Sequence, residues 1–132
     1  RLGWRVTLLD HRPAYAVPHR FSGAELVKQV ELNEWAQGFD LERYSAAVVM
    51  SHHLGADVQY LSGLARSMIP YIGLLGPPAR RERLLADLGP LARDLTTRLR
   101  APVGLNLGGR TPEAIALSIV AEIQAAFSLN AV

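Results

Sequence analysis

The chain has 132 residues, of which 49% are hydrophobic and 20% charged, with a formal net charge of +2 at pH 7. This size suits one domain, residues 1–132, with a core of its own, and the composition excludes disorder and a strongly basic nucleic-acid surface. No apolar run approaches the roughly 20 residues that span a bilayer, no secretory signal opens the chain, and cysteine is absent. We expect a cytoplasmic protein that binds neither nucleic acid nor membrane.

The first residues resemble the end of one element and the start of another. Gly3 is typical of a helix stop, and Trp4–Leu9 is a strand of β-forming residues that ends at Asp10. There is no initiator Met, so we expect a fragment that starts in mid-fold. Further along, the half-polar Ala24–Val30 is predicted to be an edge strand.

A buried strand follows at Ala46–Ser51, in the run SAAVVMSHH, where five apolar residues precede a polar end. Such a run is typical of a parallel strand covered on both faces. Asp57–Met68 has helical spacing of apolar residues, and Asp57 is the predicted N-cap. Pro70 ends this helix, and Tyr71–Leu75 is the next buried strand.

The second half of the chain repeats this alternation. Helices are predicted at Pro78–Leu88 and Pro90–Leu99, a strand at Val103–Leu107, and a last helix capped by Thr111. Strands that alternate with helices predict an α/β fold, a Rossmann-like and mostly parallel sheet with helices on both faces.

Polar or glycine residues end the predicted strands. Because the carboxyl ends of parallel strands meet at one edge of a sheet, we expect Asp10, His52, Gly76 and Asn106 to lie together there. Ligands of open α/β sheets bind at that edge.

The turn after Gly76 leads into a helix whose first turn carries Arg80 and Arg81. A helix N-terminus attracts anions, and arginines there favour a phosphate or carboxylate partner. The alternative is a solvated basic face. Glycines and Asn106 in the turn before Thr111 allow close backbone approach to a ligand, or serve turn chemistry alone.

His52 and His53 follow the central strand, with Asp57 nearby. A histidine oriented by a carboxylate can act as a base or ligand, whereas the alternative is a histidine that caps the next helix. The residues do not decide between the two histidines, and without cysteine or a second close His or Glu pair we expect no metal site.

Asp10 has two interpretations. An acidic residue at the end of the second strand of a dinucleotide fold binds ribose hydroxyls, but that fold needs a G-x-G-x-x-G about 20 residues upstream, for which the chain has no room. The other interpretation is an aspartate that opens a turn before Arg12.

Several of these motifs together resemble one family. YIGLLG…RRERLL, APVGLNLGGRTPEAIALSIVAEI and SHH-x3-D are similar to the C-terminal Rossmann domain of the XdhC/CoxI family, accessory proteins of xanthine dehydrogenase and related molybdenum hydroxylases. The resemblance covers nearly the whole chain from WRVTLLDHRP onward. It implies a glycine-rich GAGH-type loop and a first strand before the residues present here.

The resemblance also implies a function. Family members bind the molybdenum cofactor, promote its sulfuration and deliver it to the apo hydroxylase, with a cysteine desulfurase as a further partner. A non-catalytic accessory role is therefore expected, and the competing hypotheses are an NAD(P)-binding oxidoreductase and a bare interaction domain. By position, the resemblance assigns cofactor binding to a group of residues: Asp10, Arg12, His52, Asp57, Gly76, Arg80, Arg81, Asn106 and Gly108.

Two positions depart from the family pattern. Pro77 stands where many members have Ser, and Asn106 stands where Asp is usual, so a hydroxyl, an N–H and a charge are lost. In a Rossmann sheet the missing first strand lies between the strands that end at Asp10 and His52. We expect this gap to be filled by a complementing N-terminal segment or by another copy in a homo-oligomer.

Overall fold

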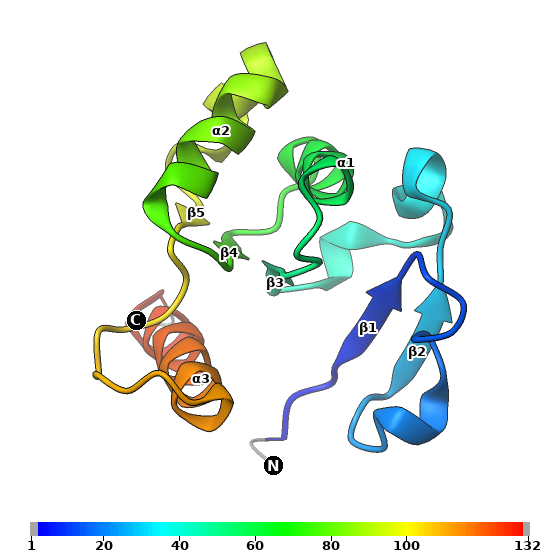
Figure 1. Ribbon diagram of the computed structural model, residues 1–132, viewed down its shortest axis with the longest axis horizontal. Helices are drawn as coiled ribbons and strands as arrows, with labels where there is room; N and C mark the ends of the chain where they lie inside the picture. The colour runs from blue at the N-terminus through cyan, green and yellow to red at the C-terminus, as the bar shows by residue number, and fades with distance from the viewer. Residues whose placement is uncertain (1–2, 131–132) are drawn as a thin grey trace. The chain divides into compact units, whose positions relative to one another are not determined.

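The computed structural model describes residues 3–130 and divides into two compact units, one ending at Phe39 and one beginning at Asp40. Each unit contains its own parallel sheet (Figure 1). Because the placement of one unit against the other is not determined, the two are described in turn.

The first unit is built on two parallel strands, β1 (Thr7–Asp10) and β2 (Leu26–Gln29). Thr7 lies opposite Leu26 and Asp10 opposite Gln29. Two short 3-10 helices complete the unit, η1 (Pro18–Arg20) and η2 (Leu32–Gly38). On β2 the exposed Leu26 and Lys28 alternate with half-buried Val27 and Gln29, which is the pattern of a strand with one covered face.

The second unit has three parallel strands in the order β3-β4-β5. Their bounds are Ala46–Val49, Tyr71–Leu74 and Leu99–Arg100. The helices are α1 (Leu54–Ala65), α2 (Pro78–Leu88) and α3 (Pro112–Asn130), with short 3-10 helices η3 (Leu41–Arg43) and η4 (Gly89–Leu95).

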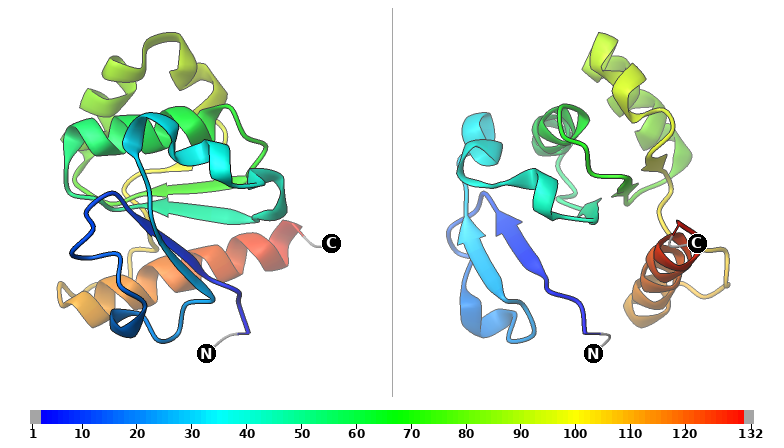
Figure 2. Two further views of the ribbon diagram at one scale, coloured as in Figure 1. Left: turned by 90° about the vertical axis from the view of Figure 1, so that its right-hand side faces the viewer. Right: turned by 180° about the vertical axis from the view of Figure 1, so that it is seen from behind.

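Helices cover both faces of the second sheet. In Figures 1 and 2, α1 and α2 lie on one face and α3 on the other. All four residues of the central strand β4 are buried, in keeping with its uninterrupted apolar sequence. The fully buried large apolar side chains of this unit are Leu61, Ile69, Ile72, Leu74, Leu84 and Leu95.

The helix ends follow local sequence signals. Pro78 occupies the first turn of α2, and Gly89, with a φ of 59°, ends that helix as predicted. Thr111 caps α3, because its Oγ1 accepts a hydrogen bond of 3.1 Å from the N–H of Ala114.

The predicted cap of α1 is wrong. The helix begins at Leu54, three residues before Asp57, and His53 is its N-cap. Nδ1 of His53 accepts a hydrogen bond of 3.1 Å from the N–H of Ala56. Asp57 instead lies inside the first turn with a side chain only 1% exposed.

The predicted strand Val103–Leu107 is also wrong, since the last strand is β5 at Leu99–Arg100. Pro102 has no N–H for the ladder, and after it the N–H of Val103 bonds once more to Leu74 O, at 3.0 Å. The N–H of Leu105 then bonds to the carbonyl of Ser118 on α3, at 3.1 Å. The chain therefore leaves the sheet for the helix before it reaches Asn106.

The helix predicted at Pro78–Leu88 is α2 with the same bounds, and the remaining predicted elements are present with shifted bounds. The strand predicted at Trp4–Leu9 is β1, and the helix predicted at Pro90–Leu99 is the shorter 3-10 helix η4. The α/β class with parallel strands is confirmed, although the described strands form two sheets and not one. No helix within residues 3–130 is long and apolar enough to cross a membrane.

The order of the strands bears on the predicted gap. β1 pairs with β2 in the first unit, and β3 pairs with β4 in the second. A Rossmann sheet has its first strand between the corresponding positions. That a complementing segment or a second copy fills this place stays a prediction.

A hydrogen bond between the sheet and α3 gives the first test. The hydroxyl of buried Tyr71 on β4 donates to Glu122 Oε1 on α3, which also accepts from the N–H of Gly104 at 3.3 Å. Burial and the Glu122 carboxylate raise the pKa of Tyr71 above its ordinary value. The folded chain therefore keeps this hydroxyl protonated at a pH where the unfolded chain ionises it.

We predict that the free energy of unfolding falls as the pH rises above about 10, where the tyrosine of the unfolded chain ionises. Tyr71→Phe removes this dependence and costs about 1–2 kcal/mol at neutral pH, because Glu122 loses a donor. Urea unfolding between about pH 9 and about pH 11 measures both effects. A variant whose stability declines as steeply as that of the wild type contradicts the assignment.

Candidate functional site

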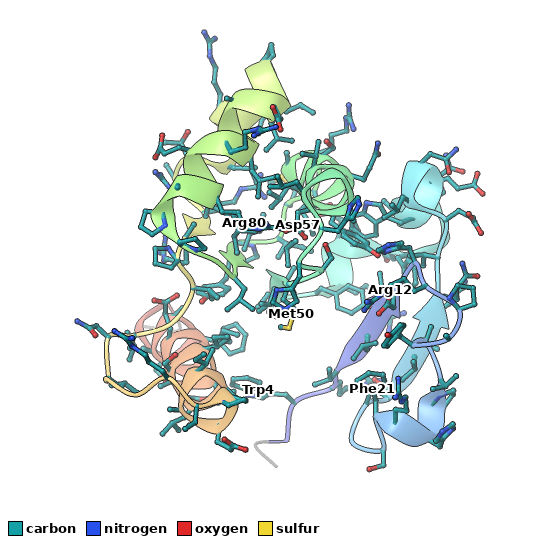
Figure 3. The ribbon with its side chains drawn as sticks, in the orientation of Figure 1. Trp4, Arg12, Phe21, Met50, Asp57 and Arg80 are labelled. Atoms are coloured by element: carbon teal, nitrogen blue, oxygen red, sulfur yellow. The ribbon has the colours of Figure 1, made fainter. Side chains whose placement is uncertain are left out.

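The buried carboxylate of Asp57 connects the turn after β3 with the turn after β4 in the second unit. Its Oδ1 accepts hydrogen bonds from the N–H of Ser51, at 3.2 Å, and from the Ser51 hydroxyl. Its Oδ2 accepts from Nη2 and Nε of Arg80, at 2.7 and 3.2 Å. Figure 3 shows Asp57 and Arg80 pointing toward one another from α1 and α2. One side chain on α1 thus connects the end of β3 with the start of α2.

The turn after β3 is fixed on both sides of His52. Ser51 is held by Asp57, and its Oγ accepts a hydrogen bond of 3.2 Å from the N–H of His53. His53 itself caps α1, which confirms the capping interpretation for this histidine. His52 lies between them with a φ of 61° and an exposed side chain. The structure therefore separates the two histidines, since His53 serves the helix and His52 faces solvent.

The turn after β4 is shaped by Gly76, which has a φ of 135°. A β-carbon at this position would come 2.5 Å from Cδ of Arg80, so glycine leaves the space through which Arg80 reaches Asp57. Arg81 is more exposed, and its Nη1 lies 2.9 Å from the carboxylate of Glu82. Pro77 is the N-cap of α2 and makes no side-chain capping bond.

The two arginines of this turn differ in what they can offer an anion. The Arg80 side chain is 20% exposed and its charge is balanced by a carboxylate that is 1% exposed. The Arg81 side chain is 38% exposed, and its partner Glu82 is largely in solvent. A surface pair of this kind is weak, so Arg81 is the cation more easily drawn to a bound phosphate.

Asn106 and Gly108 lie in the loop that leads into α3, and both are exposed. The loop is anchored at Gly104, whose missing β-carbon would come 2.5 Å from the hydroxyl oxygen of Ser118. Gly108 and Gly109 have φ values of 79° and 84°. Asn106 does not end a strand, so the reason given for placing it at the edge with His52 and Gly76 is wrong.

His52 and Gly76, in contrast, follow neighbouring parallel strands. β3 and β4 pair in register from Ala46 opposite Tyr71 to Val49 opposite Leu74, so the turns after them lie at the same edge of the sheet. This edge also carries Met50, a large apolar side chain that is 50% exposed. Neither Met50 nor the structural role of Ser51 was anticipated from the sequence, although the spacing between Ser51 and Asp57 spans the turn that they close.

Asp10 and Arg12 belong to the first unit and bind one another there, and the expected place of Asp10 at one edge with His52 stays a prediction. Oδ1 of Asp10 accepts from the N–H of Arg12 at 2.9 Å, and the guanidinium binds both carboxylate oxygens at 3.0 and 3.1 Å. This supports the turn interpretation of Asp10. The hydrogen bond from the Arg12 side chain holds the pKa of Asp10 below its ordinary value, against the opposing effect of burial.

A cavity lies at the other end of the second unit, where α1 ends. It is lined by Ala65, Arg66, Ser67, Met68, Asp94 and Arg98. The guanidinium of Arg98 donates to the carbonyls of Ala65, Ser67 and Ile69 at 2.9–3.1 Å. Arg98 thus satisfies carbonyls at the end of α1, and the cavity lies away from the turns that follow β3 and β4.

Residues 3–130 contain no group of three or more His, Asp or Glu side chains placed to hold a metal ion. The carboxylates described above are each engaged by an arginine, a serine or a tyrosine. The chemistry that the second sheet offers at its edge is therefore hydrogen bonding by an imidazole, backbone groups and an exposed guanidinium.

Comparison with known proteins shows that the chain matches one protein family. Residues 1–123 match the family described as the XdhC Rossmann domain. A protein of Bacillus subtilis described as a probable xanthine dehydrogenase subunit is 36% identical over 121 residues, which are 92% of this chain and 35% of that protein. The uncharacterized protein YqeB of Escherichia coli is 38% identical over 69 residues, 51% of this chain and 13% of its own.

A solved structure shares the fold. The crystal structure of a xanthine dehydrogenase from Bacillus halodurans superposes with a TM-score of 0.77 at 31% identity, covering 89% of this chain and 33% of that one. The chain thus spans about a third of the length of the Bacillus proteins it matches.

The Asp57–Arg80 pair gives a prediction with an internal control. Asp57→Asn leaves Arg80 without its counter-charge in a largely buried site, so we expect a loss of about 3 kcal/mol in the free energy of unfolding. Asp87→Asn breaks the Arg83–Asp87 pair on α2, whose side chains are 66% and 43% exposed. That control should cost less than about 0.5 kcal/mol. Chemical denaturation of both variants measures the two losses in the free energy of unfolding. Equal losses would contradict the role given to Asp57.

The Asp10–Arg12 contact predicts a pH effect in the first unit. Because the folded pKa of Asp10 is lowered, its contribution to stability is present above the unfolded pKa and is lost as the pH falls through the folded value. Arg12→Gln should raise the pKa of Asp10 and make acid unfolding less steep. NMR titration of the Asp10 carboxyl carbon measures the shift, and an unchanged titration curve in the variant is the contrary result.

Proposed function

The chain belongs to the XdhC Rossmann-domain family, and from that premise we propose that it binds the molybdenum cofactor as part of an accessory protein of a xanthine dehydrogenase-type hydroxylase. In this role it assists sulfuration of the cofactor and its insertion into the apo hydroxylase. The proposal places the chain in the cytoplasm, as a binding and delivery domain without chemistry of its own.

The observation that carries the proposal is the connection made by Asp57. It holds the turn after β3 and the turn before α2 in one arrangement, with His52 and Arg81 on the solvent side. Open α/β sheets bind ligands outside the carboxyl ends of neighbouring strands, where these turns lie. A pre-formed edge with few polar groups is what an orienting ligand site requires.

The residues at this edge fit the organic part of the cofactor. A phosphate needs a cation, which Arg81 supplies, whereas Pro77 and Pro78 at the start of α2 have no N–H to donate. A flat pterin ring needs hydrogen-bonding groups along its rim, for which His52 and, on the loop before α3, Asn106 are suited. Gly108 has open space where a β-carbon would stand, so its backbone is accessible to a ligand.

The composition of the chain limits what it can do to the metal and its sulfur. Without cysteine this chain offers no thiolate to molybdenum, and the contacts proposed above are with the organic part of the cofactor. This chain also has no thiol to carry a persulfide, and we propose that a cysteine desulfurase supplies the sulfur for sulfuration. When bound, the cofactor supplies the redox chemistry for the hydroxylase that receives it.

The test is expression of the complete gene product in a host that makes the cofactor, followed by assays for pterin fluorescence and molybdenum. We expect both in the purified protein, and we expect lower hydroxylase activity when the gene is deleted. Arg81→Gln should reduce the bound pterin by about tenfold, the effect of losing one charge-assisted hydrogen bond. Arg83→Gln, which removes an exposed arginine from the same helix, is the matched control and should retain it.

Two results speak against the proposal. Cofactor-free protein together with an unaffected hydroxylase would remove the accessory role. Tight binding of NAD or NADP in its place would favour a nucleotide-dependent oxidoreductase.

A further inference from the structure

Among the residues that the structure describes, His52 is the one non-glycine residue with a positive φ, at 61°. In this region the β-carbon of an L-residue crowds its own backbone, so the conformation is uncommon outside glycine, although Asn, Asp and His adopt it more often than other residues do. At the other positive-φ positions within residues 3–130 the chain has glycine: Gly3, Gly76, Gly89, Gly104, Gly108 and Gly109. His52 is therefore the one described position at which the chain keeps a side chain in this conformation.

The backbone of His52 is held in place by its neighbours. Ser51 is bound through both its N–H and its hydroxyl to Asp57, and His53 is bound to the Ser51 hydroxyl and to the first turn of α1. Arg80 holds the other oxygen of the same carboxylate. Strained residues persist where the surroundings over-determine them, and such residues cluster at ligand sites.

The imidazole is not required for this arrangement. It is exposed, and its ring makes no hydrogen bond to any other residue in the described part of the chain. Glycine would adopt the same backbone at lower cost. What histidine adds over glycine at this position is a ring with a donor and an acceptor, presented at the carboxyl edge of β3.

We infer that His52 makes the hydrogen bond that orients the bound ring, and that Arg80 is a positioning residue that acts on His52 through Asp57 and Ser51. This inference rests on the proposed function and deepens it, because it gives the two residues different roles. Arg80 binds only other residues of the protein, and His52 binds the ligand. The ligand class is a flat heterocycle with polar atoms along its rim. Phosphate recognition falls to the Arg81 side chain.

The inference predicts that replacing His52 with glycine raises the stability of the fold and lowers its affinity for the ligand. His52→Gly removes both the strain and the imidazole, whereas His52→Ala removes the imidazole and keeps the strain. We expect both variants of the complete gene product, purified from a cofactor-producing host, to lose most of their bound pterin, by about tenfold or more. The glycine variant should have a Tm about 3 °C above that of the alanine variant.

Two outcomes of this comparison would overturn the inference. If His52→Gly keeps the wild-type pterin content, His52 does not contact the ligand. If its Tm falls below that of His52→Ala, the histidine conformation is not strained. A wild-type protein without pterin would be a failure of the proposed function, and the Tm comparison would still test the strain.

The positioning role of Arg80 is tested by a double-mutant cycle. Arg80→Met should lower the pterin content, and the double variant with His52→Gly should lose no more than His52→Gly alone, because both changes remove one contact. If Arg80 instead bound the phosphate directly, the two losses would multiply. Should Arg80→Met fail to fold, Ser51→Ala serves in its place, because it breaks the same chain of hydrogen bonds with a smaller disturbance.

Discussion

The hydrogen bonds to the Asp57 carboxylate are the interaction on which the edge of the second sheet depends. A carboxylate that is 1% exposed is unfavourable unless it is paired and fully hydrogen-bonded, and here Arg80 and Ser51 supply both requirements. Because Asp57 lies on α1 and its two partners come from α2 and the turn after β3, satisfying one buried charge also fixes two turns. Gly76 belongs to the same arrangement, since a side chain at that position would block Arg80.

This arrangement divides the polar residues of the edge into those that build it and those that face solvent. Asp57, Arg80, Ser51 and His53 bind one another or cap α1, so they are parts of the scaffold. His52 and Arg81 project from that scaffold. A rigid inner layer that orients a few outer groups is the arrangement that ligand sites require. The outer groups His52 and Arg81 are the ones proposed to contact the ligand, and the inner residues hold them in position.

Much of the fold could be predicted from the sequence because its signals are local. The apolar runs of β3 and β4, the proline at the start of α2 and the Thr111 cap each depend on a few neighbouring residues. One failure involves distant residues: the strand predicted at Val103–Leu107 does not form because the N–H groups of Gly104 and Leu105 find partners on α3. The other is local, because His53, four residues before Asp57, takes the N-cap position of α1.

The sequence predicts which types of residue form the candidate site, but it does not predict the role of each residue. The sequence indicates that histidines, arginines and an aspartate follow the strands, but it cannot show that Arg80 turns inward to Asp57 while Arg81 faces solvent. It also gives no sign that His52 has a positive φ. Both facts depend on the spacing between helices, which is a property of the packed sheet.

Hydrogen–deuterium exchange of the complete gene product, with and without bound molybdenum cofactor, tests the central claim most directly. The claim is that the ligand binds at the turns fixed by Asp57. The account predicts slower exchange in the cofactor-bound protein for residues 50–57 and 76–82, and little change around the Arg98 cavity at the other end of the second unit. Protection confined to residues 65–68 and 94–98, with the two turns unchanged, would contradict it.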